Sequence, residues 1–210
     1  MVGQGVLREC LLDPGVTSVL TLGRGATGQQ HPKLREIVHA NLLDYSGLEP
    51  QLTGLDACYF CLGVTSAGKS EDEYRRITYD LTLAAATVFA RLNPNMVFIY
   101  VSGMGTDSSE QGRVMWARVK GQTENALFRL PFRAAYAFRP AGIVPLHGIV
   151  SKTFVYRVSY SVLKPFLRFL EAKFPKYVTT TEKVGRAMLR VTREGAPRRV
   201  LENIDINRLA

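Results

Sequence analysis

Cysteine is scarce in this sequence. Three cysteines in 210 residues are too few for a disulfide framework. Cys58 and Cys61 form a C-x-x-C pattern inside a predicted strand, where residues three apart point to opposite faces and cannot share a metal ion or a disulfide. We therefore expect these two thiols, and that of Cys10 in a predicted helix, to be packed in the core of a protein from a reducing compartment.

Membrane-spanning, metal-binding and hydrolase patterns are missing as well. No apolar run approaches the roughly 18 residues that span a bilayer, and the first residues lack the character of a signal peptide. His31, His39 and His147 show no metal-ligand spacing, so no metal site is predicted. No G-x-S-x-G elbow is present, which argues against a Ser-His-Asp hydrolase. These absences favour a cytoplasmic protein without a membrane partner.

Acidic residues are fewer than basic ones, and the difference lies chiefly in the last part of the chain. The net charge is +9, and residues 151–210, with thirteen Lys or Arg and five Asp or Glu, carry +8 of it. Such asymmetry occurs in nucleic-acid-binding proteins. The basic residues are scattered, however, and no nucleic-acid motif accompanies them. We therefore expect no nucleic-acid partner, and attribute the excess to a solvated surface and an anionic cofactor site.

Strand-like and helix-like segments alternate along the first 150 residues. Strands separated by helices of this length form right-handed βαβ units and a parallel sheet. The sequence therefore predicts a single doubly wound α/β domain, Rossmann-like, over residues 1–210. The predicted strands are 18–22, 37–41, 58–62, 96–101 and 134–138, and the predicted helices are 3–13, 45–52, 71–92 and 113–128.

Beyond residue 150 the alternation weakens. Residues 154–174 predict a helix rich in aromatic and aliphatic side chains, kinked or split by Pro165. A second helix, 180–194, begins at a Thr-Thr-Glu cap signal, and 200–204 predicts a short last strand. The wide apolar faces of the first helix favour a substrate-pocket wall or a homodimer interface over a membrane surface. Residues 151–200 are thus expected to be a small helical part that completes a pocket or a subunit contact.

The region around residues 98–120 carries the strongest functional signal. Ser102 ends a predicted strand, where parallel sheets place their ligands. Trp116 and Lys120 lie one turn apart on one face of the following helix. Glycines and a proline follow other strands in a regular order. The full set is Gly3, Leu62, Gly63, Ser102, Trp116, Lys120 and Pro140.

This ordered set resembles the atypical short-chain dehydrogenase/reductases, especially the NAD(P)H-binding branch that includes the Tat-interacting oxidoreductase-like proteins. Residues 1–10 are similar to the tail of the opening G-x-x-G-x-x-G motif, with Gly3 as its third glycine, and Phe60-Cys-Leu-Gly63 resembles the glycine turn beside the cofactor. The likeness covers roughly residues 1–145. Its first strand and first two glycines have no counterpart here. We expect a truncated start; the alternative is a chain that cannot bind a dinucleotide in the usual way.

The resemblance implies a nicotinamide dinucleotide cofactor. Arg24 follows the strand where a ribose-binding acid would indicate NAD, and no Asp or Glu lies between Pro14 and Glu36. A basic residue there suits the 2′-phosphate of NADP, with NAD as the second possibility, although an exposed loop arginine is the alternative. Leu42 either lies against the adenine or packs at a strand end. The implied cofactor-binding residues are Gly3, Arg24, Leu42, Leu62, Gly63, Lys120 and Pro140.

The resemblance also assigns catalytic positions to Ser102, Lys120 and Trp116. In the family, Ser orients the substrate carbonyl, Tyr exchanges a proton with it, and Lys lowers the pKa of the phenol and holds the ribose. Here the only tryptophan stands at the tyrosine position, and its indole offers a donor that does not titrate usefully. We predict an NAD(P)-binding oxidoreductase or epimerase-like protein with a degenerate site, or a non-catalytic dinucleotide sensor or scaffold.

A competing motif lies at Gly63–Ser70, which fits the P-loop pattern G-x-x-x-x-G-K-[ST] between a strand and a helix. It would make the protein a P-loop nucleotidase. Against this, three carboxylates follow Ser70 directly, and no strand ends in an Asp that would hold magnesium. We therefore favour a loop beside the nicotinamide end of the cofactor.

Overall fold

The computed structural model describes residues 1–149 and 174–210. Residues 151–173 of the predicted pocket or interface part lie outside the described residues, and so do the break at Pro165 and all but the last residue of the predicted helix 154–174.

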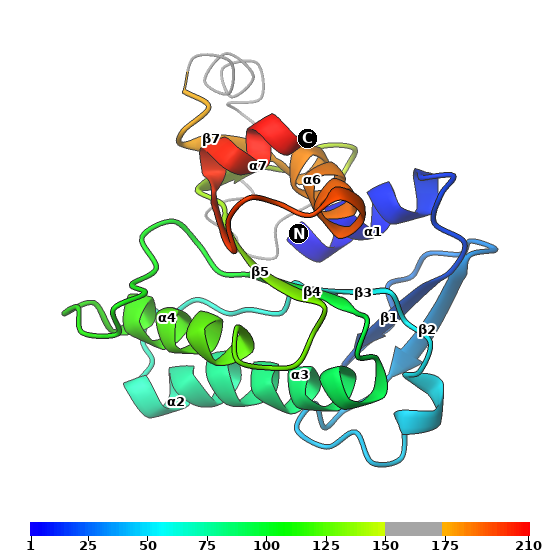
Figure 1. Ribbon diagram of the computed structural model, residues 1–210, viewed down its shortest axis with the longest axis horizontal. Coiled ribbons are helices and arrows are strands. Elements are labelled where there is room, and N and C mark those ends of the chain that lie inside the picture. The colour runs from blue at the N-terminus through cyan, green and yellow to red at the C-terminus, as the bar shows by residue number, and fades with distance from the viewer. Residues whose placement is uncertain (150–173) are drawn as a thin grey trace.

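A parallel β-layer lies between two layers of helices (Figure 1). Helices α3 (Leu81–Leu92) and α4 (Met115–Leu127) cover one face, and α1 (Val2–Leu12) and α6 (Thr181–Glu194) cover the other. This arrangement confirms the predicted Rossmann-like α/β fold with helices in the C-terminal part.

The strands form separate parallel groups. β1 (Val19–Gly23) pairs with β2 (Leu34–Val38), with Val19 opposite Leu34. The larger group has the order β3-β4-β5-β8, and a short pair β6-β7 lies beyond it. Their bounds are β3 Ala57–Phe60, β4 Val97–Val101, β5 Ala134–Arg139, β8 Val200–Glu202, β6 Gly142–Val144 and β7 Val178–Thr180.

Two apolar clusters hold the layers together. β4, with the sequence VFIYV, sends alternate side chains into each, which is the pattern of a strand buried on both faces. Ile99 packs with Val184 and Met188 of α6, while Phe98 packs on the other face with Phe89 of α3 and with Leu127. The middle of the larger sheet group is therefore rigid, and the residues at its carboxyl end have fixed positions.

The helices largely follow the sequence signals. α6 begins where the Thr180 hydroxyl accepts a hydrogen bond from the Lys183 amide at 3.0 Å, and it ends at Gly195 with φ +75°. The predicted helix 71–92 is one continuous run of α2 (Glu71–Arg75), a π-helical turn η2 (Arg76–Asp80) and α3. These local predictions are confirmed because caps and apolar periodicity are encoded within a few residues.

Three predicted elements differ from the structure. The second strand is Leu34–Val38 instead of 37–41, because its register is set by pairing with β1. Residues 45–52 contain only the 3-10 turn η1 (Glu49–Gln51). The strand at residue 200 stops at Glu202, where a capping box with Asp205 starts α7 (Asn203–Leu209). The sequence interpretation missed that helix.

Candidate functional site

The carboxyl ends of β4 and β5 meet at one edge of the larger sheet group. Ser102 follows β4 and Pro140 follows β5, and the Met104 amide donates to the Pro140 carbonyl at 3.0 Å. The Ser102 amide donates to the carbonyl of Phe138 at 2.9 Å, which continues the ladder to the strand end. These backbone bonds fix the two loops beside each other.

Lys120 reaches this edge from α4. Its ammonium donates to the Ser102 carbonyl oxygen at 2.9 Å and lies 5.6 Å from the centre of the Tyr100 ring. Burial lowers the pKa of Lys120 to about 8, and the nearby Glu124 carboxylate offsets part of that effect. The structure therefore brings Ser102 and Lys120 together, as their spacing predicts, with the pKa of the ammonium lowered toward the neutral range.

Trp116 lies one turn before Lys120 on α4. Its indole ring packs at Gly105, where an added Cβ would meet the ring at 3.5 Å. Gly105 has φ +86°, a conformation that favours glycine. The ring is thus held against the loop that follows β4, at the position where the resemblance implies a phenol.

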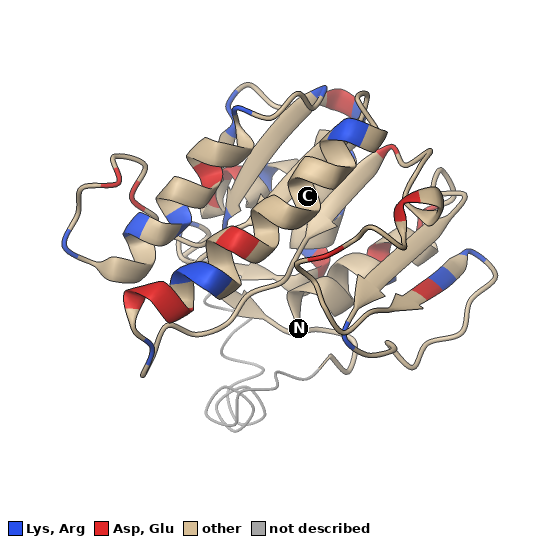
Figure 2. Cartoon of the chain, turned by 90° about the horizontal axis from the view of Figure 1, so that it is seen from below, with Lys and Arg blue, Asp and Glu red and all other residues tan. Residues whose placement is uncertain are grey.

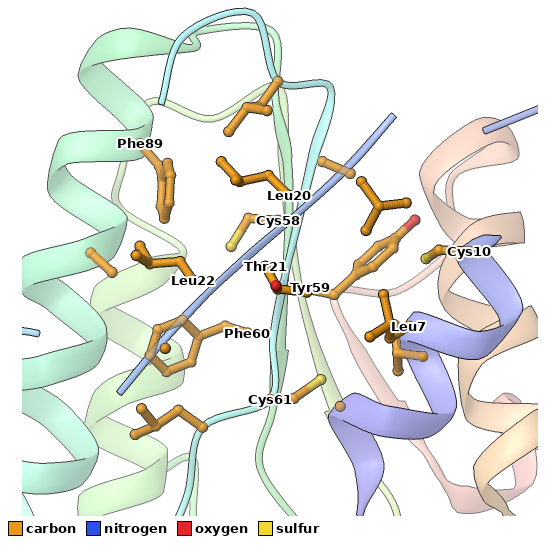
Figure 3. A pocket seen from close by; sticks show the side chains of 18 of the residues that line it. Leu7, Cys10, Leu20, Thr21, Leu22, Cys58, Tyr59, Phe60, Cys61 and Phe89 are labelled. Atoms are coloured by element: carbon orange, nitrogen blue, oxygen red, sulfur yellow. The ribbon is translucent and has the colours of Figure 1, made fainter. Parts of the chain in front are cut away.

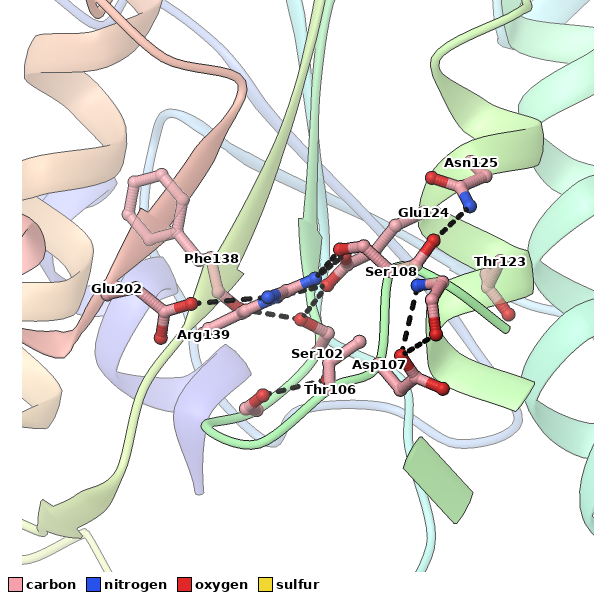
Figure 4. Close-up of polar contacts among 12 residues, drawn as sticks. Ser102, Thr106, Asp107, Ser108, Thr123, Glu124, Asn125, Phe138, Arg139 and Glu202 are labelled. Carbon is pink, nitrogen blue, oxygen red and sulfur yellow. Dashed lines mark hydrogen bonds and ion pairs between the residues drawn. The ribbon is translucent and has the colours of Figure 1, made fainter. Parts of the chain in front are cut away.

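The Ser102 hydroxyl is used inside the protein. It donates to the Glu124 carboxylate at 2.5 Å, and Glu124 also accepts two bonds from Arg139, at 3.0 Å from Nε and 2.5 Å from Nη2 (Figure 4). Glu124 has no exposed surface, and Arg139 is also buried. Arg139 further contacts Glu202 at 3.2 Å. The Ser102 hydroxyl therefore has acceptors within the protein, Glu124 and the Phe138 carbonyl oxygen at 3.3 Å.

The sequence interpretation overlooked Glu124. It shares the buried side of α4 with Ala117, Gly121 and Leu127, at helical spacings of three and four residues. A carboxylate within such an apolar stripe is the signal that points to a buried ion pair.

A second feature is a cavity of about 1220 Å³ between β1 and β3. Its wall includes Tyr59, whose hydroxyl hydrogen-bonds Thr192 at 2.9 Å. Burial raises the pKa of the Cys10 and Cys61 thiols to about 12, so both are protonated at neutral pH. Cys58 and Cys61 point to opposite sides of β3 (Figure 3), as the strand geometry predicts. Five predicted cofactor-binding residues line this cavity, namely Gly3, Arg24, Leu42, Leu62 and Gly63.

The predicted site residues therefore fall into two adjoining groups. The first group lines the cavity and its mouth, and Gly3 lies there at the start of α1, where an added Cβ would be 3.3 Å from the Cβ of Cys61. The second group comprises Ser102, Trp116, Lys120 and Pro140, which are not part of the cavity wall. Both groups lie at carboxyl ends of strands, the position at which doubly wound sheets bind ligands.

The P-loop motif has a structural role. Ser70 is the N-cap of α2: its hydroxyl accepts from the Glu73 amide at 3.3 Å, and the Glu73 carboxylate accepts from the Ser70 amide at 2.9 Å. The carboxylate thus occupies the helix start where a phosphate would bind in a P-loop. The geometry gives no support to the nucleotidase alternative.

Within residues 1–149 and 174–210, no group of three or more His, Cys, Asp or Glu side chains could hold a metal ion. Over the same residues, none of the helices has both the length and the apolar character that a bilayer crossing requires.

Comparison with known proteins gives a sequence relative and several structural relatives. No protein-family model matches the chain. Protein fmp52-2, mitochondrial, of Aspergillus oryzae is 26% identical over 146 residues, which is 68% of this chain and 63% of that protein. The chain thus spans less than two thirds of the length of this curated relative.

Solved structures match over nearly the whole chain. A UDP-N-acetylglucosamine 4-epimerase from Methanobrevibacter ruminantium has a TM-score of 0.66 at 13% identity, covering 95% of this chain and 71% of its own. WbmF of Bordetella bronchiseptica, in complex with NAD+, has a TM-score of 0.61 at 13% identity, covering 99% and 73%. A Burkholderia thailandensis oxidoreductase of the short-chain dehydrogenase/reductase family has a TM-score of 0.60 at 16% identity. The match covers 93% of this chain and 82% of that protein.

The fold is that of the short-chain dehydrogenase/reductases and related epimerases. In doubly wound folds of this kind, ligands bind at the carboxyl ends of the parallel strands.

Proposed function

We propose that the protein binds a nicotinamide dinucleotide across the carboxyl ends of β1, β3 and β4, with NADP(H) preferred over NAD(H). The observation that carries this proposal is the convergence of Gly3, Arg24, Leu62 and Gly63 at one cavity. Gly3 permits the close approach of α1 to β3 that the third glycine of the fingerprint provides. A structural relative that is bound to NAD+ adds support. The residues present therefore fit this cofactor.

Each residue has a distinct task in this proposal. The amino end of α1 would face the pyrophosphate, Arg24 would pair with a 2′-phosphate, Leu42 would border the adenine, and the Lys120 ammonium would donate to the ribose. When bound, the cofactor supplies a hydride. Trp116 has no titrating proton to deliver with it, and Tyr100 cannot substitute because burial raises the pKa of its phenol far above the usual value. Carbonyl reduction is accordingly slow, in an atypical oxidoreductase or epimerase-like protein.

A non-catalytic dinucleotide sensor or scaffold is the second candidate. It is favoured by the Ser102 hydroxyl, which donates to Glu124, and by Trp116 at the position of the acid. Both features remove catalytic groups without removing the Lys120 ammonium. Tight dinucleotide binding without turnover would distinguish this function from the first.

The partners and location remain proposals. Lys and Arg are interspersed with Asp and Glu on the side of the molecule in Figure 2, which supports a small-molecule ligand over a nucleic acid. A homodimer and a cytoplasmic location stay predictions of the sequence. The name of the Aspergillus oryzae relative assigns that protein to mitochondria.

A titration tests dinucleotide binding directly. Trp116 is the only tryptophan of the chain and lies one turn from Lys120, so bound NADPH should quench its emission. Calorimetry with NADPH and NADH provides an independent measurement of the affinities. No binding of either nucleotide at millimolar concentration, in a folded sample, would refute the proposal.

Replacing Arg24 by alanine is expected to reduce the preference for NADPH over NADH by about tenfold or more, because a charge-assisted bond to the 2′-phosphate is worth roughly 1.5–3 kcal/mol. The loop is held independently by Glu36, whose carboxylate accepts from the Thr27 amide at 2.8 Å, so the variant should keep its shape. Arg198→Ala, at an exposed arginine outside the cavity wall, is the control. Equal preference in both variants would exclude a role for Arg24.

The affinity for NADPH is expected to fall as pH rises through about 8. Burial lowers the pKa of Lys120 to that value, so the ammonium that donates to the ribose is present below pH 8 and is lost above it. Lys120→Met should bind more weakly at pH 7 and show no such fall. Calorimetry from pH 6.5 to 9.5 makes the comparison, and a parallel decline in both proteins would contradict this role of Lys120.

A further inference from the structure

A second, smaller cavity lies at the amino ends of β4 and β5, beneath the last turn of α6. Its volume is about 280 Å³. β5 has six residues, so about 20 Å of strand separates this cavity from the edge that carries Ser102 and Pro140. Small-molecule pockets usually measure about 300–1,000 Å³. The size of this cavity therefore suits a ligand much smaller than a dinucleotide.

Part of the cavity wall is apolar. Val97 begins β4, Ala134 begins β5, and Val191 comes from the carboxyl-terminal part of α6. Val97 and Val191 are buried members of the apolar cluster that holds α6 on the sheet, so their positions are fixed. A ligand in this cavity therefore gains free energy from an apolar body that packs against these side chains.

The Tyr136 hydroxyl contributes a hydrogen-bond donor to the same wall. Tyr136 is only 9% exposed, and its oxygen accepts from the Ala196 amide at 3.2 Å. Among the residues that the structure describes, no acceptor takes the hydroxyl hydrogen. Gly195 also borders the cavity, and an added Cβ there would be 3.4 Å from the hydroxyl oxygen, so glycine leaves this group open. A buried donor without an acceptor is costly, and an acceptor atom of a ligand removes that cost.

Arg133 contributes a positive charge. One of its nitrogens donates to a carbonyl oxygen in the last turn of α6 at 3.0 Å, but within residues 1–149 and 174–210 the guanidinium has no carboxylate partner. The two other charged side chains of the wall are paired. Arg193 binds Asp13 at 2.5 Å. Glu194 binds Arg190 at 2.9 Å. The wall thus offers one positive charge without a counterion, which is complementary to a ligand with one negative charge.

We propose that this second cavity binds a small carboxylate with an apolar body, such as an aromatic acid. The ligand carboxylate accepts from the Tyr136 hydroxyl and the Arg133 guanidinium, and the apolar body packs against Val97 and Val191. Arg133 and Thr192 also border the larger cavity, so the two cavities adjoin at the amino ends of the strands. The dinucleotide is proposed to bind at the carboxyl ends. The inference is therefore independent of the proposed function, and its test measures binding alone.

Benzoate is the probe, and calorimetry at pH 7 compares it with benzamide and with inorganic phosphate. Benzamide has the ring without the charge, whereas phosphate has the charge without an apolar body. Benzoate should bind at one site per chain, at least about tenfold more tightly than either comparison compound. The proposal is overturned if benzoate does not bind at millimolar concentration, or if benzamide or phosphate binds as tightly.

Arg133→Met and Tyr136→Phe remove the two polar groups one at a time. Each substitution should weaken benzoate binding by about tenfold, because each removes a hydrogen bond to a charged acceptor. Arg198→Met, at an exposed arginine outside the cavity wall, is the control and should leave the affinity unchanged. Circular dichroism shows whether each variant is folded. If a folded Arg133→Met or Tyr136→Phe variant binds benzoate as tightly as the control, the proposal is wrong.

Chemical shifts of the unaltered chain locate the site even if a variant does not fold. Benzoate should shift the amide signals of Ala134, Gly195 and Ala196 most and change those of Gly63 and Ser102 little. The opposite pattern, or displacement of benzoate by NADPH, would place benzoate in the dinucleotide site and overturn the proposal. Failure of NADPH itself to bind would refute the proposed function and leave the expected benzoate shifts unchanged.

Discussion

Replacing Glu124 by glutamine is expected to destabilise the folded protein by about 3–5 kcal/mol, because the change leaves the buried Arg139 guanidinium without its bidentate partner. Glu124 is fully buried, and Arg139 donates to both of its carboxylate oxygens. The Ser102 hydroxyl loses its anionic acceptor in the same step. Thermal unfolding should show a Tm lower by roughly 10 °C, and urea unfolding should give the free energy.

Glu71→Gln is the matched control for that experiment. Glu71 pairs with Arg118 at 2.6 Å, close to the 2.5 Å between Glu124 and Arg139, but its side chain is 43% exposed. An exposed pair contributes at most about 1 kcal/mol. If the two substitutions lower the Tm equally, burial of Glu124 does not control its contribution, and the explanation is wrong.

Replacing Trp116 by tyrosine is expected to raise NADPH-dependent carbonyl reduction by about two to four orders of magnitude, the usual gain from a positioned general acid. The new phenol would lie one turn from the Lys120 ammonium, whose charge lowers the pKa of a nearby phenol. The measurement is NADPH oxidation over a broad panel of aldehydes and ketones. Calorimetry confirms cofactor binding first, since the variant loses the fluorescent side chain.

Trp116→Phe is the control that distinguishes two effects of Trp116→Tyr, namely the gain of a phenol hydroxyl and the loss of the larger indole ring. Phenylalanine also removes the large ring that packs at Gly105 but provides no hydroxyl, so it should give no gain. Equal activity in the two variants would mean that the lost phenol does not limit turnover. If both bind NADPH and neither reduces any carbonyl, the sensor function is favoured over the degenerate oxidoreductase.

Much of the fold follows from short stretches of sequence. The Thr-Thr-Glu signal places the start of α6, and the run VFIYV defines β4 because every residue in it is apolar. The spacing of Ser102 and Lys120 also brings them to one strand end, since strand and helix geometry fix their positions. In these cases the residues that determine the structure lie close together in the sequence.

Other features depend on residues far apart in the chain. The register of β2 is set by β1, and this moved the strand three residues from its predicted start. The role of the Ser102 hydroxyl depends on Glu124 and Arg139, which come from α4 and β5. No local pattern specifies which of its neighbours a buried hydroxyl will meet.

The sequence by itself determined the alternation of strands and helices, the α/β class and the residues that reach the strand ends, because these depend on period, caps and turns. Only the tertiary structure showed that the β-layer is divided at a cavity between β1 and β3 and that a buried ion pair takes up the Ser102 hydroxyl. Strand neighbours and buried partners are selected by packing of the whole chain, which contributes free energy that no single segment encodes.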